Sequence, residues 1–159
     1  MKLSSQEEYG LRCLLQIARA GDGASLTIAE VSEREGISAP NVAKIMRLLR
    51  RAELVRSTRG KAGGYSLARP ASDLRVLDVV NALGGKLFDA SFCDKHAGLE
   101  SSCLNTSDCS IRPVLRHLQA AVDAALGELT LESLLASEQE VAGTIHPRGI
   151  PLPVVSRPS

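Results

Sequence analysis

The stretch from Leu26 to Leu67 constrains the fold of this 159-residue chain more than any other part of it. Thr27 and Glu30 form a capping box, which predicts the start of a short helix that Gly36 should end. Ser38 is the expected cap of a second helix. The core-facing side of that second helix is predicted from apolar residues at helical spacing, which are Val42, Ile45, Met46 and Leu49.

The same stretch continues into a predicted hairpin. Residues 54–57 and 65–67 are short runs typical of strands, and the turn between them, 60–64, contains three glycines. Two short helices followed by a two-stranded hairpin indicate a winged helix-turn-helix. We therefore expect a chain that is mainly α with a small β-hairpin wing.

Further helical patterns flank this unit. Ser4 and Ser5 each precede a glutamate by three residues, which predicts a helix with two apolar stripes that ends near Gly21. Residues 76–83 predict another helix. Ser110 is the expected cap of a longer helix, in which small alanines would allow another helix to approach closely.

These patterns divide the chain into four parts. Residues 1–84 are the winged helix-turn-helix, and residues 85–110 are a loop that contains three of the four cysteines. Residues 111–136 hold the long helix and a short terminal helix capped by Thr130. Residues 137–159 contain four prolines and no periodicity, so a mobile tail is expected there.

Positive charge is concentrated in residues 44–75. Nine Lys and Arg residues and two acidic residues give this segment +7, whereas the whole chain carries +1. Taken singly, each cation would suit a solvated surface, but a basic helix pair and wing indicate double-stranded DNA as partner. The low aromatic content, 3% with no Trp, argues against stacking of single strands. The residues expected to contact DNA are Ser38, Asn41, Lys44, Arg47, Arg51, Arg59 and Lys61.

The cysteine loop predicts a metal centre. Cys93, Cys103 and Cys109 are spaced C-x9-C-x5-C, and Cys109 precedes a predicted helix whose dipole favours a thiolate. The chain shows no signal-peptide pattern and no run of about 18 apolar residues, so we expect a cytoplasmic protein without a membrane partner. Thiols stay reduced in that compartment, where clustered cysteines favour a metal or a cluster over disulfides.

The fourth ligand of such a centre stays open at this point. Cys13 lies on an apolar helix stripe with Tyr9 and Ile17, which favours a small buried side chain over a ligand. Glu8 also suits a role as a helix-capping partner. The candidates are His96, Asp94, Asp108, Cys13 and Glu8 from a partner chain.

Several segments together resemble the bacterial Rrf-two family of winged-helix iron–sulfur transcription regulators, the relatives of IscR, NsrR and RsrR. The similarity extends from Met1 to about Leu135. It is carried by Met1-Lys-Leu-Ser4 with Glu8-Tyr9, Gly36-Ile-Ser38, Leu54-Val55, Arg59-Gly-Lys-Ala-Gly-Gly-Tyr65, Leu77-Asp-Val-Val80 and the three-cysteine loop.

The resemblance implies a homodimer that pairs through the long helix and holds an iron–sulfur cluster on Cys93, Cys103 and Cys109. Two departures are visible: the first cysteine gap is nine residues instead of about five, and Arg112 stands where a histidine ligand would be expected. Some members use an acidic residue in the first helix of the partner chain, and Glu8 occupies that place. The type of cluster is left open between [2Fe–2S] and [4Fe–4S], and [2Fe–2S] is preferred.

The sequence therefore predicts a dimeric, non-enzymatic regulator in which a cluster that senses redox state, iron or nitric oxide controls operator binding. One alternative keeps the DNA binding but places a structural zinc on Cys93, His96, Cys103 and Cys109. Another is an iron–sulfur electron-transfer module, which the wing and the lack of a fourth loop cysteine disfavour.

Overall fold

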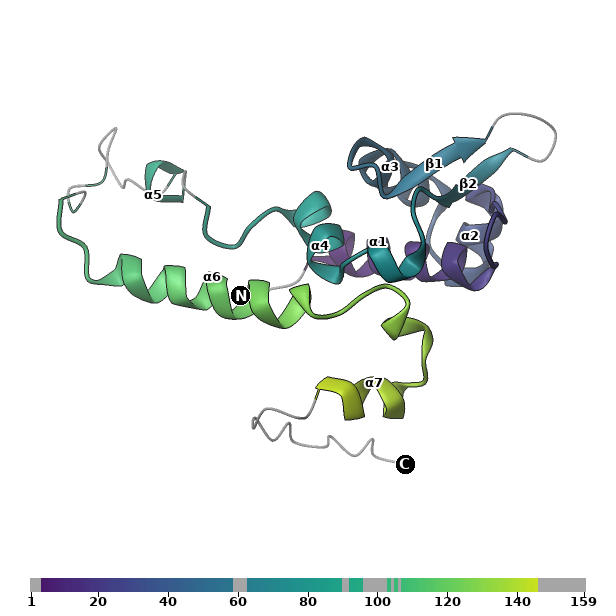
Figure 1. The fold of residues 1–159 in the computed structure, drawn as a ribbon. Coiled ribbons are helices and arrows are strands. Elements are labelled where there is room, and N and C mark those ends of the chain that lie inside the picture. The colour runs from purple at the N-terminus through teal and green to yellow at the C-terminus, as the bar shows by residue number, and fades with distance from the viewer. Residues whose placement is uncertain are drawn as a thin grey trace, which may run out of the picture.

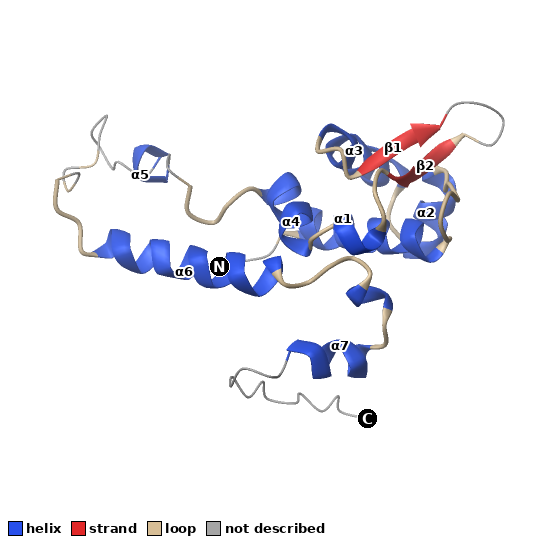
Figure 2. Cartoon of the chain, viewed as in Figure 1, coloured by secondary structure: helices blue, strands red, loops and turns tan. Residues whose placement is uncertain are grey.

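The computed structural model describes residues 4–58, 63–89, 92–95, 103, 105 and 107–145. Seven helices and two strands follow one another in this part of the chain (Figures 1 and 2), with two short 3-10 turns at Ala71–Asp73 and Ser133–Leu135. The elements are α1 (Ser5–Arg19), α2 (Ile28–Glu35), α3 (Ala39–Arg51), β1 (Val55–Thr58), β2 (Gly64–Leu67), α4 (Val76–Gly84), α5 (Phe92–Lys95), α6 (Ile111–Gly127) and α7 (Glu138–Ile145).

The core lies where α1 packs against α2, α3 and α4. The predicted apolar face of α3 is confirmed, since Val42, Ile45, Met46 and Leu49 are all buried. Helix α1 is buried along much of its length, and Cys13, Leu14 and Ile17 are almost fully inaccessible. The half-buried Tyr9, Leu11 and Leu15 pack against the core on either side of these residues, which explains why the apolar residues of α1 form two stripes.

The helix-turn-helix begins and turns as its sequence predicts. Thr27 accepts a hydrogen bond from the backbone of Glu30 and donates its own backbone N–H to the Glu30 carboxylate, at 3.2 and 2.7 Å. Gly36 ends α2 with φ of +64°, a left-handed conformation that residues with a Cβ adopt at a cost. Helix α3 begins three residues later, at Ala39, so its direction is set by this turn.

The hairpin is fixed to the helices at its base. Strands β1 and β2 are antiparallel, with Val55 opposite Leu67, and Leu26 extends the pairing through two backbone hydrogen bonds with Tyr65, of 3.0 and 2.8 Å. A Cβ at Gly64 would lie 2.7 Å from the carbonyl oxygen of Leu26, which is closer than two such atoms can approach. Only glycine fits at this crossing without a shift of the backbone.

Helix α6 is anchored at its C-terminal end and projects from the core at the other (Figure 1). Backbone hydrogen bonds from Val76 to Leu129 and from Leu131 to Leu74, of 2.9 and 2.8 Å, hold the anchored end. The Arg75 guanidinium also donates to the carbonyl of Gly127. The N-terminal end of α6 lies on the far side of α4 from α3 (Figure 1).

The structure differs from the sequence predictions at three places. Residues 92–95 form one helical turn inside the predicted loop, and Glu138–Ile145 form α7, so the prediction of a segment without regular structure from residue 137 is wrong there. Ser137 and Glu140 form a capping box that starts α7. Ser38 and Ser110 stand at the expected helix starts, but neither side chain makes a capping hydrogen bond.

Among the residues that the structure describes, no helix combines the length and apolar character needed to cross a bilayer.

Candidate functional site

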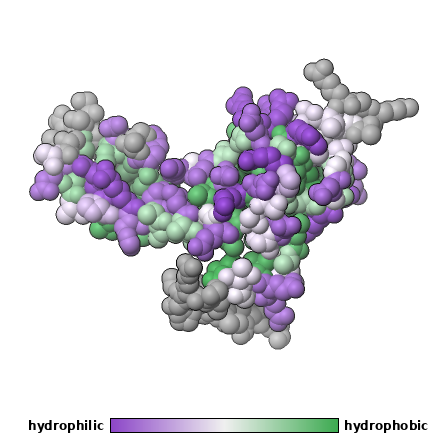
Figure 3. Space-filling view, in the orientation of Figure 1, coloured by the Kyte–Doolittle hydropathy of each residue, from purple (hydrophilic) through white to green (hydrophobic). Residues whose placement is uncertain are grey.

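The face of α3 that points away from the core is polar and basic. Because Val42, Met46 and Leu49 are buried, the opposite side of α3 in helical projection faces outward, and Lys44, Arg47 and Arg51 on that side are all exposed. Ser38 and Asn41 are exposed at the start of the same helix. Hydrophilic side chains gather over α3 in the space-filling view (Figure 3). The structure thus brings five of the seven predicted DNA contacts onto one helix.

The other two predicted contacts, Arg59 and Lys61, lie outside the described residues. Two further cations adjoin the surface: Arg50 is exposed on α3, and Arg56 is exposed on β1 and donates to the Ser66 hydroxyl at 3.1 Å. Helix α3 itself contains no acidic residue. Its outer surface therefore presents uncompensated positive charge, which suits the phosphates of DNA.

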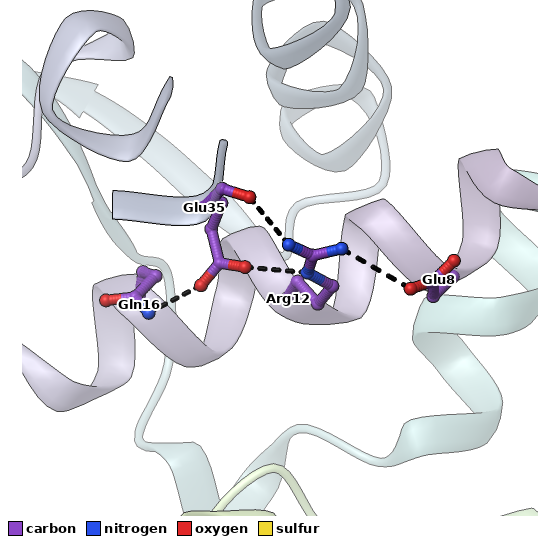
Figure 4. Close-up of polar contacts among 4 residues, drawn as sticks. All are labelled: Glu8, Arg12, Gln16 and Glu35. Carbon is purple, nitrogen blue, oxygen red and sulfur yellow. Dashed lines mark hydrogen bonds and ion pairs between the residues drawn. The ribbon is translucent and has the colours of Figure 1, made fainter. Parts of the chain in front are cut away.

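A polar network joins α1 to the end of α2 (Figure 4). Arg12 donates from Nε to the carboxylate of Glu35 at 2.7 Å and from a terminal nitrogen to the Glu35 carbonyl at 2.6 Å. Gln16 donates to the other carboxylate oxygen at 2.5 Å. The Glu35 side chain is only 9% exposed, so these bonds satisfy a nearly buried charge.

Glu8 is the outer member of the same network. Its carboxylate lies 3.4 Å from Arg12 and is 55% exposed, whereas Glu35 holds Arg12 through two shorter bonds. The hydrogen bond with Glu35 is also the main reason that the pKa of Arg12 is raised. Glu8 can therefore leave Arg12 without breaking the connection between α1 and α2.

The three loop cysteines flank α5 and α6. Cys93 lies on α5, Cys109 lies two residues before α6, and Cys103 lies between them; all three are half-buried with free thiols. Cys93 lines a hollow of about 440 Å³ between α5 and α6, together with Phe88, Phe92, Leu115, Asp89, Arg112 and Arg116. Within the described ranges, no three His, Cys, Asp or Glu side chains are arranged to hold a metal ion. The alternative ligand His96 lies outside those ranges.

Cys13 differs from the other cysteines, in agreement with the expectation of a buried hydrophobic role. It is completely inaccessible in the core between α1 and its neighbours. Burial raises the pKa of its thiol to about 11, and the Glu35 carboxylate acts in the same direction. A thiol of this kind is neither exposed nor ionised at neutral pH, which suits packing and disfavours ligation.

We therefore expect iodoacetamide at pH 8 to label the three loop cysteines of metal-free protein and to spare Cys13. With a pKa of about 11, roughly one Cys13 thiol in a thousand is ionised at that pH, and the ionised fraction becomes substantial only as the pH approaches 11. Peptide mass spectrometry over time checks this, with guanidinium-unfolded protein as the control in which all four cysteines react. Labelling of Cys13 at the rate of the loop cysteines in folded protein would contradict its burial.

The sequence reasoning missed the network around Arg12. Glu8, Arg12 and Gln16 are spaced four residues apart, so they form a polar stripe on α1 that could have been detected from the sequence. Only the apolar residues of this helix entered the prediction. The partner Glu35 lies 23 residues from Arg12, and a pairing over this separation has no local signal.

Known proteins resemble this chain over most of its length. The model of the Rrf2 (Rrf-two) family, described as an iron-dependent transcriptional regulator, matches residues 3–137. Protein rrf2 of Nitratidesulfovibrio vulgaris is 35% identical over 135 residues, which cover 85% of this chain and 87% of the relative. The transcriptional regulator IscR of Vibrio atlanticus is 32% identical over 139 residues, 87% of this chain and 78% of the relative.

Solved structures agree with these sequence relatives. IscR of T. potens superposes with a TM-score of 0.66 at 27% identity and covers 85% of this chain and 86% of its own. CymR, the global cysteine regulator of B. subtilis, superposes with a TM-score of 0.67 at 23% identity over 85% of this chain and 96% of its own, which shows the shared fold. The relatives regulate transcription, a non-enzymatic role. With its winged helix-turn-helix and a match over residues 3–137, the chain belongs to the Rrf2 family of transcriptional regulators.

Proposed function

We propose that the protein is a homodimeric, cytoplasmic regulator whose affinity for operator DNA is controlled by an iron–sulfur cluster that responds to redox state, iron or nitric oxide. The observation that carries the DNA-binding part is the exposed basic face of α3. Lys44 and Arg47 are placed to reach base edges or phosphates when a helix of this kind lies in the major groove. Contacts to phosphates make the affinity fall steeply with salt.

The cysteine loop supplies the donors for the cluster. Cys93, Cys103 and Cys109 carry free, half-buried thiols, and cysteine thiolates are the usual ligands of iron–sulfur clusters. Thiolates are the type of donor that this group requires, although the three thiols are not gathered into one metal site in the described part of the chain. Of the two cluster types, [2Fe–2S] is preferred over [4Fe–4S]. When bound, a cluster supplies iron whose ligands and oxidation state respond to oxidants, nitric oxide and iron supply. The proteins named IscR among the relatives support this proposal.

The exposed side of α6 supports a homodimer. Ile111, Val114 and Leu118 lie on this helix with 63, 58 and 47% of their surfaces exposed, although all three are large and apolar. A second copy that packs along this side would bury them. Within one chain α5 and the N-terminal end of α6 lie far from α3 (Figure 1), so a partner also gives the cluster a route to a DNA-reading helix.

Glu8 of the partner subunit is the proposed fourth ligand. Its carboxylate is exposed at the N-terminal end of α1, and the Arg12 that it contacts stays bound to Glu35 at the end of α2. A change at Glu8 would therefore act on α1, and α1 is tied directly to the helix-turn-helix. Oxygen ligands bind iron less tenaciously than thiolates do, which suits a site that must open in response to a signal.

Replacing Glu8 with Ala tests this assignment. Three thiolates would remain, so we expect a cluster that forms but has an altered visible spectrum and is lost faster in air. His96→Ala should leave the spectrum unchanged and serves as the control within the loop. A normal spectrum in Glu8→Ala together with cluster loss in His96→Ala would move the fourth ligand into the loop.

The function as a whole is tested by anaerobic purification followed by iron and sulfide analysis. A brown protein with stoichiometric iron and sulfide is expected, whereas zinc at the same cysteines would leave the protein colourless. Fluorescence anisotropy with operator DNA selected in vitro should then give different dissociation constants for cluster-loaded and cluster-free protein at one salt concentration. Equal constants would reject control by the cluster.

A further inference from the structure

A small notch separates the first turns of α1 from the first half of α3. It has a volume of about 140 Å³, and we call it the α1–α3 notch; it is lined by Ser5, Gln6, Tyr9, Asn41, Lys44 and Ile45. We propose that this notch seats one backbone phosphate of the DNA, so that α1 binds DNA directly beside α3. This inference rests on the proposed function, because it assumes that α3 enters the major groove.

The groups that line the notch suit a phosphate. The exposed Lys44 provides an ammonium group on one wall, and Ser5 and Tyr9 provide hydroxyl groups on the other. All three can donate hydrogen bonds to phosphate oxygens. Ile45 is buried and contributes apolar surface. The volume accommodates a single phosphate group, and no acidic side chain is among the lining residues.

The two acidic residues of the same turn of α1 point elsewhere. Glu7 is buried, and its carboxylate accepts a hydrogen bond of 2.7 Å from the backbone of Ser4. Glu8 lies beside Arg12, at 3.4 Å. The positive charge of Lys44 is therefore not cancelled inside the notch by these neighbouring carboxylates.

The position of the notch fits the geometry of a helix in the major groove. Asn41 and Lys44 are three residues apart and share the side of α3 that meets α1. A helix in the major groove has a sugar–phosphate backbone along each of its sides, whereas the bases lie ahead of it. A polar notch at the side of α3 would therefore meet a phosphate, and α1 would form its outer wall.

The α1 wall is held in place before DNA binds. Gln6 donates from its side-chain amide to the carbonyl of Leu83 at 2.5 Å, which fixes the first turns of α1 onto α4. The Tyr9 ring packs against Arg12, whose guanidinium carbon lies 5.6 Å from the ring centre. Gln6 and Tyr9 therefore need little ordering on binding, which favours affinity. Tyr9 also places the notch next to the network that includes Glu8.

Tyr9→Phe is the most specific probe, because it removes the hydroxyl and keeps the ring that packs against Arg12. We expect this variant to bind operator DNA about threefold to tenfold more weakly at fixed salt, as for the loss of one hydrogen bond. Tyr65→Phe is the matched control, since it removes the only other tyrosine hydroxyl of the chain. Its affinity should stay at the wild-type value, and the unfolding midpoints of both variants should show that they are folded.

A second measurement identifies the phosphate. Methylphosphonate replaces the phosphates of each operator half-site one at a time, which removes a single charge. One position should weaken wild-type binding, and it should weaken Lys44→Ala much less and Tyr9→Phe somewhat less, because each variant has already lost one of the contacts to that phosphate. Methylphosphonate at this position should lower the affinity of Arg47→Ala as much as it lowers that of the wild type, since Arg47 does not line the notch.

The outcomes distinguish failure of the proposed function from failure of the notch proposal. Salt-independent, sequence-independent or absent binding by the wild-type protein would reject the proposed function. Operator binding that Arg47→Ala weakens, with Tyr9→Phe equal to wild type, would reject the notch alone. A Tyr9→Phe defect that adds equally to the penalty at every methylphosphonate position would also overturn the phosphate seat, because it would show an indirect effect on α3.

Discussion

Complete loss of the iron–sulfur cluster is expected when Cys93, Cys103 or Cys109 is replaced with Ala. Each of the three free, half-buried thiols is a proposed ligand, and removing one leaves two thiolates and one weak oxygen donor. Protein made and purified without oxygen should then lack the visible absorbance of the cluster and should contain little iron or sulfide.

Cys13→Ala is the matched control for these variants. Its sulfur lies in the core and does not face the loop, so iron and sulfide should remain at wild-type levels while stability falls moderately because a small cavity is left. A loop variant that keeps its full iron and sulfide content would exclude that cysteine from the ligand set. Loss of the cluster in Cys13→Ala, with the protein still folded, would require a different set of ligands.

Lys44→Ala and Arg47→Ala should each weaken operator binding, and the double variant should weaken it most. Both side chains project from the exposed face of α3, opposite the buried Val42 and Leu49. A contact to a base edge is worth about 1–3 kcal/mol, or roughly 5- to 150-fold in affinity for each residue. A contact to a phosphate would instead lower the slope of log affinity against log salt by about one.

Anisotropy titrations at several salt concentrations distinguish the two kinds of contact. Arg19→Ala is the control, since Arg19 is an exposed cation in the last turn of α1 and outside the proposed DNA surface. It should change the dissociation constant by less than about twofold, given the screening of exposed charges at a distance. Unchanged affinity in both single variants and in the double variant would show that another element reads the operator.

The DNA-reading unit was predictable because its signals are local. Thr27 and Glu30 are three residues apart, and Gly36 ends α2 by its own conformational preference. The burial of Val42 and Met46 follows from their spacing on one helix, and the exposure of Lys44 follows from the same periodicity. For these features, neighbours in sequence determine the structure.

The elements that were missed have weaker or longer-range causes. Helix α5 is a single turn that begins at Phe92, and the ring of Phe92 makes an edge-to-face contact with Phe88 that periodicity does not reveal. The capping box of α7 was visible at Ser137 and Glu140, but the prolines that follow in the sequence favoured an irregular tail. Whether a serine at a helix start makes a capping hydrogen bond depends on its rotamer and on its surroundings. The Ser38 side chain makes none.

The candidate site also combines features that the sequence reveals with features that only the folded chain reveals. Spacing along the chain was enough to select Cys93, Cys103 and Cys109, but it does not determine how the three thiols are arranged in space. The contact between Arg12 and Glu35 joins separate helices and depends on the packing of α1 against α2. The sequence therefore indicates which groups are available, whereas the connection between Glu8 and the helix-turn-helix became visible only in the folded chain.

The crossing at Gly64 limits how wings can be exchanged between members of such a family. A Cβ at this position would meet the carbonyl oxygen of Leu26 at 2.7 Å and the backbone nitrogen of Thr27 at 3.2 Å. Thr27 is the cap of α2, so a transplanted hairpin with a larger residue at its base would displace the start of the helix-turn-helix along with the wing. A graft that retains this glycine would keep both the base of the hairpin and the start of α2 in place.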